Sequence, residues 1–534
     1  MPFSDIQIMK ITDLSLREKI LQTLVIRLNK DQFDPRQVGA VFSFGEIITE
    51  ADDAGLANAR RILAEYIDNA KIPVLITSDF ENGCGSMLKG LTPFPYMMGL
   101  GATNSEEIAY NYGKATALEA RSMGANWTFS PVCDLNINRR NPLVNVRGMT
   151  DDPELATRLL KQVIRGMQEN GLAACAKHFP GDGMDYRDQH MMTTHNSLPY
   201  NEWLEKHGRV FQELIDDGVY SIMAGHITLL DYQKKVFENG RKLPATLSDE
   251  LITNLLKKEM GFGGVVVTDA LGMGGFLGWY PDRRRADVES FKAGCDMMLW
   301  PSAHYVDDMV EAVENGYVPM ERLDDAVTRV LEMKEKLGMF DHDNHAITLK
   351  PEDIAFVKKA QKDTAEHSLT LVRDELNVFP FDREKIKKIA VIPATHYQPA
   401  FDVGEHLCEE LRAKGFEVDY FRTGVPGPEL EGLGKRYDVI LYALFSRPFR
   451  PQGFLDFMGK EAITVGNCGK YNAGKTVVVS FGSPYFGEQY FERLPVYVNA
   501  YSMLDPSVEA FARAAVGEIP FTDFSPVKLQ TGEL

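Results

Sequence analysis

The sequence predicts an α/β protein of two domains, an N-terminal (β/α)8-type TIM barrel followed by a smaller C-terminal α/β sandwich domain. The 534 residues exceed what a single core usually holds, about 250–300 residues. Across the first two-thirds of the chain, short apolar runs alternate with amphipathic segments about seven times. Such alternation is typical of a parallel sheet covered by helices, and this many repeats favour a closed barrel over an open sheet. The last third of the chain has apolar runs of its own.

The expected strands of the barrel are short apolar runs, and segments with helical periodicity lie between them. The runs are Gly39–Phe44, Pro73–Ser78, Trp127–Val132, Leu172–Ala176, Tyr220–Ala224, Gly264–Thr268 and Asp296–Leu299. The helical segments are Glu106–Met123, Pro153–Asn170, Asn201–Asp217, Asp249–Met260 and Arg284–Ala293. A barrel of this type has eight strands, and one of the eight has no obvious run in the sequence. We therefore expect the barrel to be one recognisable strand short.

The second region continues the α/β pattern on a smaller scale. Two helical segments, Met320–Leu337 and Pro351–Ser368, lead into it. Its expected strands are Ile389–Pro393, Val439–Leu444, Val477–Phe481 and Val496–Ala500, and its expected helices are Glu405–Lys414 and Ser507–Val516. The pattern predicts a barrel over residues 1–340, a helical linker over residues 341–370 and the sandwich domain over residues 371–534.

The composition is that of an ordinary globular protein, with 44% hydrophobic and 25% charged residues. A net charge of −18 argues against nucleic acid and anionic membrane surfaces as partners. The N-terminus has no continuous apolar core of a signal peptide, and no run is long enough for a membrane span. The six cysteines are scattered without a C-x-x-C pair, so we expect buried free thiols and a cytoplasmic location.

Polar side chains follow the expected strands of the barrel. They are Asp79, Asp134, Lys177, His178, His226 and Asp269. In a barrel the carboxyl ends of the strands meet at one rim, and this rim is where active sites are found. One aspartate after a strand is equally consistent with a helix cap, whereas five such strand ends in one chain predict a functional site.

A segment rich in glycine and proline follows the expected fourth strand, and it contains Asp188 and His190 two residues apart. An aspartate beside a histidine orients the ring and stabilises its protonated form, which makes an acid/base suited to neutral pH. Gly181 and Gly183 would serve as hinges, so we expect this loop to be mobile. The Asp-x-His spacing also occurs by chance in many loops, which leaves a purely structural role open on spacing alone.

Several motifs, taken in order, resemble glycoside hydrolase family 3, and within it the β-N-acetylglucosaminidase branch. They are Leu16-Arg17-Glu18-Lys19-Ile20, Asp79-Phe80-Glu81-Asn82-Gly83, Ser130-Pro131-Val132-Cys133-Asp134-Leu135-Asn136, Lys177-His178-Phe179-Pro180-Gly181 with Asp188 and His190, Met223-Ala224-Gly225-His226, Val267-Thr268-Asp269-Ala270-Leu271-Gly272-Met273, and the segment from Ser368 to Pro380. The resemblance implies a barrel with a C-terminal sandwich, no cofactor and no metal.

The resemblance also implies roles for the residues at the rim. Asp269 matches the family nucleophile, and His190 matches the acid/base with Asp188 as the residue that holds it. The implied substrate-binding residues are Asp79, Arg147, Lys177, His178, His226 and Asp134. Arg147 could equally form a surface ion pair with Asp151 or Asp152, and Asp134 could be structural.

Two positions depart from the pattern of the branch. Asp182 stands where the branch usually has a histidine, which puts the contribution of that histidine in doubt. Asn82 interrupts the glycine pair of the D-x-E-G-G motif, which affects the loop more than the chemistry.

The implied reaction is the removal of terminal β-linked GlcNAc from small glycosides, such as peptidoglycan fragments, through a covalent glycosyl-enzyme. Phosphorolysis, with phosphate as the acceptor, is the main alternative, and β-glucosidase activity is another. Two readings come from other classes: a non-catalytic carbohydrate-binding protein, and a metal hydrolase whose ligands would be His178, His190, His195, Asp185 and Asp188. The sequence leaves the aglycone and the oligomeric state open.

Overall fold

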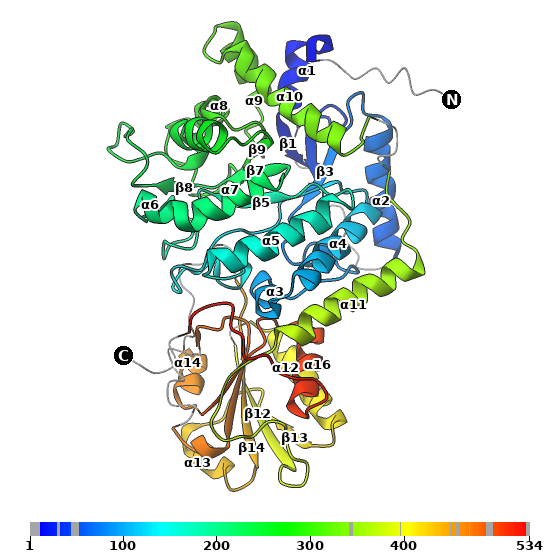
Figure 1. The fold of residues 1–534 in the computed structure, drawn as a ribbon, viewed down its shortest axis with the longest axis vertical. Coiled ribbons are helices and arrows are strands. Elements are labelled where there is room, and N and C mark those ends of the chain that lie inside the picture. Colours follow the sequence, from blue (N-terminus) through cyan, green and yellow to red (C-terminus); the bar gives the residue numbers. More distant parts are fainter. Residues whose placement is uncertain are drawn as a thin grey trace.

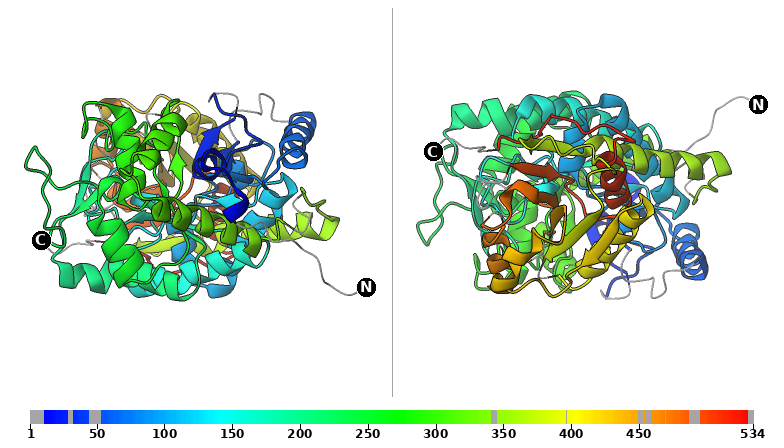
Figure 2. Two further views of the ribbon diagram at one scale, coloured as in Figure 1. Left: turned by 90° about the horizontal axis from the view of Figure 1, so that it is seen from above. Right: turned by 90° about the horizontal axis from the view of Figure 1, so that it is seen from below.

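The computed structural model describes residues 11–28, 32–43, 53–340, 345–395, 397–448, 451, 453, 457, 459–468, 470–486 and 495–529. The N-terminal and C-terminal domains are stacked along the long axis of the molecule (Figure 1), so the view from below faces the C-terminal domain (Figure 2). Within these residues, no helix combines the length and the apolar character that a membrane crossing requires.

A ring of parallel strands forms the centre of the N-terminal domain. In the described ranges its eight members are β1 (Leu24–Arg27), β2 (Ala40–Phe42), β3 (Leu75–Ser78), β4 (Trp127–Thr128), β5 (Cys175–Phe179), β7 (Ser221–Ala224), β9 (Val265–Thr268) and β10 (Met298–Leu299). Hydrogen bonds link them in the orders β10-β1-β2-β3-β4 and β5-β7-β9. Parallel bridges from Trp127 to Ala173 and from Val267 to Met297 close the ring. The predicted barrel is therefore confirmed.

Strand β1 is the strand that the sequence did not reveal. Its apolar residues begin shortly after the end of helix α1 (Leu16–Leu21), so they look like a continuation of that helix. The barrel is thus complete in its eight strands, and the strand with no obvious run in the sequence is the first one. Its first strand lies between β10 and β2 in the ring.

Helices cover the outside of the barrel. They include α2 (Asp53–Asp68), α4 (Glu106–Ser122), α5 (Pro153–Gln168), α7 (Arg209–Asp216), α8 (Arg283–Ala293), α9 (Tyr305–Glu314) and α10 (Met320–Lys336). Helix α5 begins at a capping residue, Asp152, which accepts a hydrogen bond from the backbone N–H of Glu154 at 2.9 Å. A Cβ at Gly113 of α4 would lie 2.1 Å from the carbonyl oxygen of Val163 in α5, so the two helices touch along their backbones.

The segment after β5 differs from the expectation in two ways. The strand spans Cys175–Phe179 rather than Leu172–Ala176, so Lys177 and His178 lie within it and not beyond its end. The expected helix Asn201–Asp217 is divided into α6 (Tyr200–Trp203), a π-helical turn (Leu204–Gly208) and α7. Two short strands outside the ring, β6 (Thr194–Asn196) and β8 (Ile227–Leu229), pair in parallel. This pairing joins the loop after β5 to the loop after β7.

In its described residues, the C-terminal domain is a six-stranded sheet between two layers of helices. Its strands are β11 (Thr370–Asp374), β12 (Lys388–Ala394), β13 (Glu417–Tyr420), β14 (Val439–Phe445), β15 (Thr476–Phe481) and β16 (Val496–Asn499), in the order β11-β16-β15-β14-β12-β13. All are parallel except the edge strand β11. Helices α12 (Ala400–Ala413) and α16 (Asp505–Ala515) cover one face, and α13 (Gly427–Leu433) and α14 (Gly459–Gly466) cover the other (Figure 1). The predicted sandwich is confirmed.

Helix α11 (Pro351–Ser368) connects the two domains. It packs against α3 (Met97–Thr103) and α4 of the barrel and against α16 of the sandwich. The side-chain amide of Gln361 in α11 donates a hydrogen bond to the carbonyl oxygen of Pro93 at 2.6 Å. The Asn145 amide nitrogen of the barrel also donates to Ser483 Oγ of the sandwich at 3.1 Å. The six cysteines are all buried and unpaired, as the sequence predicted.

Glu119 gives the barrel a pH-dependent contact. Its buried carboxylate accepts hydrogen bonds from the backbone N–H and the hydroxyl of Thr92, and burial raises its pKa to about 7. Because the folded state keeps this proton after an unfolded carboxyl would lose it, the contribution of Glu119 to stability falls as pH rises from about 4.5 to about 7. We expect the melting temperature of Glu119→Gln, measured relative to that of the native protein, to increase as pH rises from 5 to 8. A difference in melting temperature between the two proteins that does not change with pH would contradict this expectation.

Candidate active site

The polar residues that follow the strands meet at one rim of the barrel, as the sequence predicted. Asp79 follows β3, Asp134 lies beyond β4, Lys177 and His178 lie near the end of β5, His226 follows β7 and Asp269 follows β9. The parallel ladders hold these strand ends side by side. Three contacts, between Lys177 and Asp79, between His178 and Asp134 and between His178 and Asp269, tie four of the five strand ends together.

Two buried cations and two carboxylates form one side of the rim. Lys177 Nζ lies 2.6 Å from Asp79 Oδ1 and 2.8 Å from Glu81 Oε1. Arg147 makes a bidentate pair with Glu81, with both nitrogen–oxygen distances at 2.8 Å. Burial disfavours both cations, but the carboxylates outweigh it and raise the pKa of Lys177 and of Arg147. A side of this kind presents fixed charges to a polar ligand.

The alternative partners considered for Arg147 are engaged elsewhere. Asp152 caps helix α5, and the Asp151 carboxylate accepts a hydrogen bond from the backbone N–H of Lys528 at 3.0 Å. Arg147 itself is buried, so it is not a surface ion pair.

Glu81 neutralises two buried cations, so we expect the stability of the barrel to be sensitive to its substitution. Replacing it with glutamine keeps the shape but leaves Arg147 without its carboxylate partner. We expect Glu81→Gln to lower the free energy of unfolding of the barrel by about 3–5 kcal/mol, measured by urea denaturation. Glu213→Gln is the matched control, because Glu213 is a partly exposed partner of Lys161 and should change stability by no more than about 1 kcal/mol. Equal effects of the two substitutions would contradict the expectation.

His178 lies between two aspartates. Its Nδ1 is 2.6 Å from Asp134 Oδ2, and its Nε2 is 3.8 Å from Asp269 Oδ2. The Asp134 carboxylate also accepts hydrogen bonds from the backbone N–H groups of His178 and Asp182. Burial would raise the pKa of Asp134, but His178 and these hydrogen bonds hold it below its usual value. An ionised Asp134 fixes the proton of His178 on Nδ1 and turns Nε2 toward the centre of the site.

Asp269 is a largely buried carboxylate just beyond the end of β9. Its Oδ1 accepts a hydrogen bond from the backbone N–H of Ala270 at 2.8 Å, and its Oδ2 faces His178. Burial would raise its pKa, but the neighbouring rings of His178, His226 and His190 outweigh burial and lower the pKa to about 2. The carboxylate is therefore charged throughout the neutral range.

Asp188 and His190 form a pair on the loop after β5. His190 Nδ1 and its backbone nitrogen lie 2.7 and 2.8 Å from Asp188 Oδ1. The Asp188 side chain is fully buried, while that of His190 keeps 23% of its surface exposed. The backbone N–H of Gly274, in the segment after Asp269, donates to the His190 carbonyl oxygen at 2.8 Å. The pair is thus docked beside the loop that bears Asp269, with the ring reachable from solvent.

The two glycines expected to act as hinges in this loop have conformations that only glycine adopts readily. Gly181 and Gly183 have φ angles of +112° and +94°. A Cβ on Gly181 would meet the ring of His207, and one on Gly183 would lie 1.9 Å from the Leu135 carbonyl oxygen. Both glycines therefore allow close packing, and the mobility of the loop stays a prediction.

His226 and Asp182 lie beneath the rim. His226 is fully buried, with Nδ1 2.9 Å from Thr246 Oγ1 and Nε2 3.0 Å from the Ala270 carbonyl oxygen. Both ring nitrogens are thus engaged, and the contact of Nε2 with Ala270 supports the segment that follows Asp269. Asp182 accepts hydrogen bonds from Asn141 Nδ2 and from the backbone N–H of Gly183. Its burial, reinforced by the nearby Asp134, raises its pKa to about 7.

The residues considered as a metal site are held by separate partners. His178 pairs with Asp134, His190 with Asp188, and His195 contacts Thr228 at 2.7 Å, while Asp185 binds Arg187. Over the part of the chain that the structure describes, no cluster of three or more such side chains is arranged to hold a metal ion.

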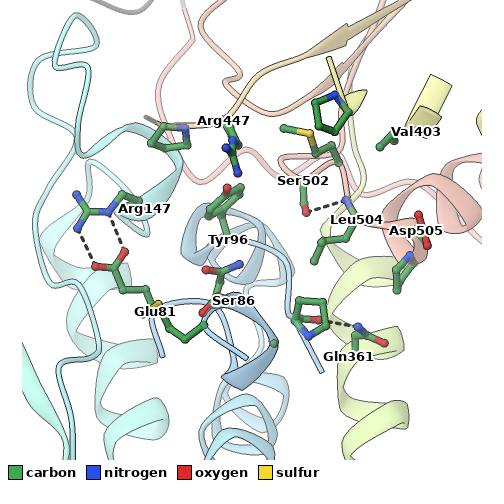
Figure 3. A pocket seen from close by; sticks show the side chains of 18 of the residues that line it. Glu81, Ser86, Tyr96, Arg147, Gln361, Val403, Arg447, Ser502, Leu504 and Asp505 are labelled. Atoms are coloured by element: carbon green, nitrogen blue, oxygen red, sulfur yellow. Dashed lines mark hydrogen bonds and ion pairs between the residues drawn. The ribbon is translucent and has the colours of Figure 1, made fainter. Parts of the chain in front are cut away.

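A cavity of about 830 Å³ adjoins the rim and reaches the C-terminal domain (Figure 3). From the barrel it is lined by Asp79, Glu81, Tyr96 and Arg147, and Figure 3 shows the Arg147–Glu81 pair on one side of it. From the sandwich it is lined by residues beyond the carboxyl ends of β12, β14 and β16, including Tyr397, Arg447 and Met503. The guanidinium of Arg447 lies 4.0 Å from the centre of the Tyr397 ring. The cavity leaves room for a ligand that extends from the rim toward the C-terminal domain.

The barrel and its rim define an enzyme that acts on carbohydrates. A family model described as "Glycosyl hydrolase family 3 N terminal domain" matches residues 15–333, and the chain belongs to that family. It is 30% identical over 503 residues to a "Beta-N-acetylglucosaminidase/beta-glucosidase" of Cellulomonas fimi, covering 89% of this chain and 87% of the relative.

Solved structures agree with this assignment over both domains. One of a "Beta-glucoside phosphorylase BglX" has a TM-score of 0.87 at 29% identity and covers 98% of this chain and 95% of its own. One of a family 3 beta-N-acetylglucosaminidase from Paenibacillus sp. str. FPU-7 has a TM-score of 0.80 at 26% identity and covers 97% of this chain and all of its own. The protein is therefore a family 3 glycoside hydrolase in both sequence and fold.

The sequence predicted the rim residues but not their partners. Glu81 stood out only as part of a motif, because its partner Arg147 lies 66 residues away in the sequence. Asn141 and Gln189 gave no signal, because buried amides are identified only once their hydrogen bonds are seen.

Proposed function

We propose that the protein is a retaining β-N-acetylglucosaminidase that removes terminal β-linked GlcNAc from small glycosides. The main support is the position of the Asp188–His190 pair, which is docked on the loop that follows the ionised carboxylate of Asp269. A retaining glycosidase needs such a nucleophile on one side of the anomeric carbon and a proton donor at the glycosidic oxygen.

In the first step, Asp269 Oδ2 attacks the anomeric carbon while protonated His190 gives its proton to the glycosidic oxygen. The bond between the anomeric carbon and that oxygen breaks, the aglycone leaves as an alcohol, and a glycosyl ester forms on Asp269. Asp188 keeps the ring aimed by accepting a hydrogen bond from its Nδ1–H.

In the second step, neutral His190 takes a proton from water, and the water oxygen attacks the anomeric carbon. The ester bond to Asp269 breaks, and the sugar is released with its original configuration. Asp79 and Lys177, with Arg147 behind them, bind sugar hydroxyls, and His178 Nε2, whose ring carries its proton on Nδ1, accepts a hydrogen bond from a sugar hydroxyl beside the nucleophile.

The sugar assignment is supported by the names of the relatives, several of which are beta-hexosaminidases or beta-N-acetylglucosaminidases. Fragments of peptidoglycan bearing terminal GlcNAc are the simplest substrates for an enzyme of this kind in the cytoplasm, which is the location that we propose. The same site is compatible with β-glucosidase activity, because the Cellulomonas fimi relative is named for both activities.

Phosphorolysis is the second candidate function. It is favoured by the similarity to BglX, a beta-glucoside phosphorylase, over 98% of this chain. Phosphate would replace water in the second step and attack the glycosyl ester directly. A neutral imidazole repels an incoming phosphate less than a carboxylate base would, so a histidine at position 190 suits this acceptor.

A panel of 4-nitrophenyl β-glycosides of GlcNAc, glucose and xylose, run with and without phosphate, tests the proposal. The proposal is supported if the GlcNAc compound is hydrolysed with the highest kcat/KM of the three and needs no phosphate. A rate that rises with phosphate, with a sugar 1-phosphate as product, would favour the phosphorylase. Preference for the glucose compound without phosphate would favour a β-glucosidase.

A further inference from the structure

We infer that Gln189 is a positioning residue that holds His190 against the nucleophile, with Asp182 as its partner. The inference rests on the proposed role of His190 as the acid/base. Gln189 lies between Asp188 and His190 in the chain, and its side chain is buried in the barrel end while its two neighbours form the pair described above.

Both ends of the Gln189 amide are used. Its Nε2 donates to Asp182 Oδ2 at 3.3 Å, and its Oε1 accepts from the backbone N–H of His226 at 3.0 Å. Gln189 is fully buried, and Asp182 is 2% exposed. Because a buried amide that loses a partner is costly, this side chain has one preferred position.

The backbone of Gln189 is fixed by a third element. Its carbonyl oxygen accepts from the N–H of Gly275 at 3.0 Å, next to the hydrogen bond from Gly274 to His190. A Cβ on Gly274 would lie 2.3 Å from the Met191 carbonyl oxygen, and one on Gly275 would lie 2.6 Å from that of Gln189. The two glycines therefore let the loop that bears the acid/base lie directly on the loop that bears Asp269.

Gln189 thus joins three strand ends at one point. It connects the start of its own loop through Asp182, the end of β7 through His226, and the segment after β9 through Gly275. The distance between His190 and Asp269 is set by these contacts, since the Asp188–His190 pair makes the ring rigid only relative to its own turn. Asp182, which stands where related enzymes usually have histidine, supplies the acceptor that Gln189 needs.

The test compares Gln189→Ala and Gln189→Asn with the native enzyme on two β-glycosides of the preferred sugar. One has 2,4-dinitrophenol, which departs without protonation, as the aglycone, and the other has methanol, which needs it. We expect Gln189→Ala to lose about 10–100-fold in kcat/KM on the methyl glycoside and about threefold or less on the dinitrophenyl glycoside. Gln189→Asn keeps the amide, so it should fold and show a smaller difference of the same sign.

Exchanging the amide and the carboxylate between positions 189 and 182 tests whether Asp182 is the partner of Gln189. Gln189→Glu alone places two carboxylates together and should lose as much as Gln189→Ala on the methyl glycoside. Adding Asp182→Asn lets the new amide donate to the carboxylate introduced at position 189 and should restore at least about tenfold. Failure of the double variant to improve on Gln189→Glu would overturn the assignment of Asp182 as the partner.

Gln233→Ala is the matched control. Gln233 is also buried, and its amide bridges the Leu229 N–H and the Leu243 carbonyl oxygen without contacting Asp182, Asp188 or His190. The Gln233→Ala substitution should lower the melting temperature without changing the ratio of kcat/KM on the two substrates. If Gln189→Ala loses equal kcat/KM on both substrates while His190→Ala still loses more on the methyl glycoside, the inference is overturned and the proposed function stands. A native enzyme without activity on any β-glycoside would instead overturn the proposed function.

Discussion

Replacing Asp269 with alanine is expected to lower kcat/KM on a 4-nitrophenyl β-glycoside by about 10⁴-fold or more, because no other group can form the glycosyl ester. The fold should survive. The carboxylate accepts a hydrogen bond from the Ala270 N–H, and its backbone is held separately by a hydrogen bond from its N–H to the Ala224 carbonyl oxygen. Steady-state kinetics with circular dichroism on the same sample checks both expectations.

Two further measurements separate a nucleophile from a binding residue. Azide should restore activity of Asp269→Ala on the 4-nitrophenyl substrate, because the small anion fits where the carboxylate stood. The product should be a glycosyl azide of inverted configuration, since one displacement replaces two. In the native enzyme, a 2-deoxy-2-fluoro or 5-fluoro glycosyl compound should label Asp269 by mass spectrometry. Label on any other carboxylate would reject the assignment.

The strands of both domains could be predicted from the sequence where the apolar run was isolated. Strands β7, β9 and β14 match their expected runs within two residues. Strand β1 was hidden because it follows helix α1 with no turn signal between them. The edge strands β11 and β13 were also missed. Their outer residues are partly exposed, so they lack the continuous apolar character of a buried parallel strand.

The rim residues could be predicted because position in a barrel follows from the order of strands. Each polar group beyond a strand end has to lie at the same rim, whichever residues come between. What the groups bind could not be predicted in this way. These contacts depend on side-chain directions over loops of irregular backbone. Two examples are the pairing of Glu81 with both Arg147 and Lys177 and the hydrogen bonds of Gln189 with Asp182 and His226.

The second prediction with a large effect concerns His190. Protonation of the leaving group matters most when the aglycone is a poor leaving group, and general acid catalysis typically contributes about 10²–10⁴-fold. His190→Ala should therefore lose about 10²-fold or more in kcat/KM on a natural disaccharide. The loss should be much smaller on a 4-nitrophenyl glycoside, whose phenolate departs with little help. The two rates are measured side by side on the same enzyme preparation.

Asp188→Ala should show the same pattern more weakly, since it leaves the ring in place but removes the carboxylate that aims it. The second step distinguishes acid from base. With a 4-nitrophenyl substrate, His190→Ala should accumulate the glycosyl-enzyme and release nitrophenol in a burst, because water then lacks its proton acceptor while Asp269 still attacks. Equal losses on both substrates and no burst would make His190 a binding residue. The proton donor would then have to be another group on this loop, with Asp182 and Asp185 as the first carboxylates to test.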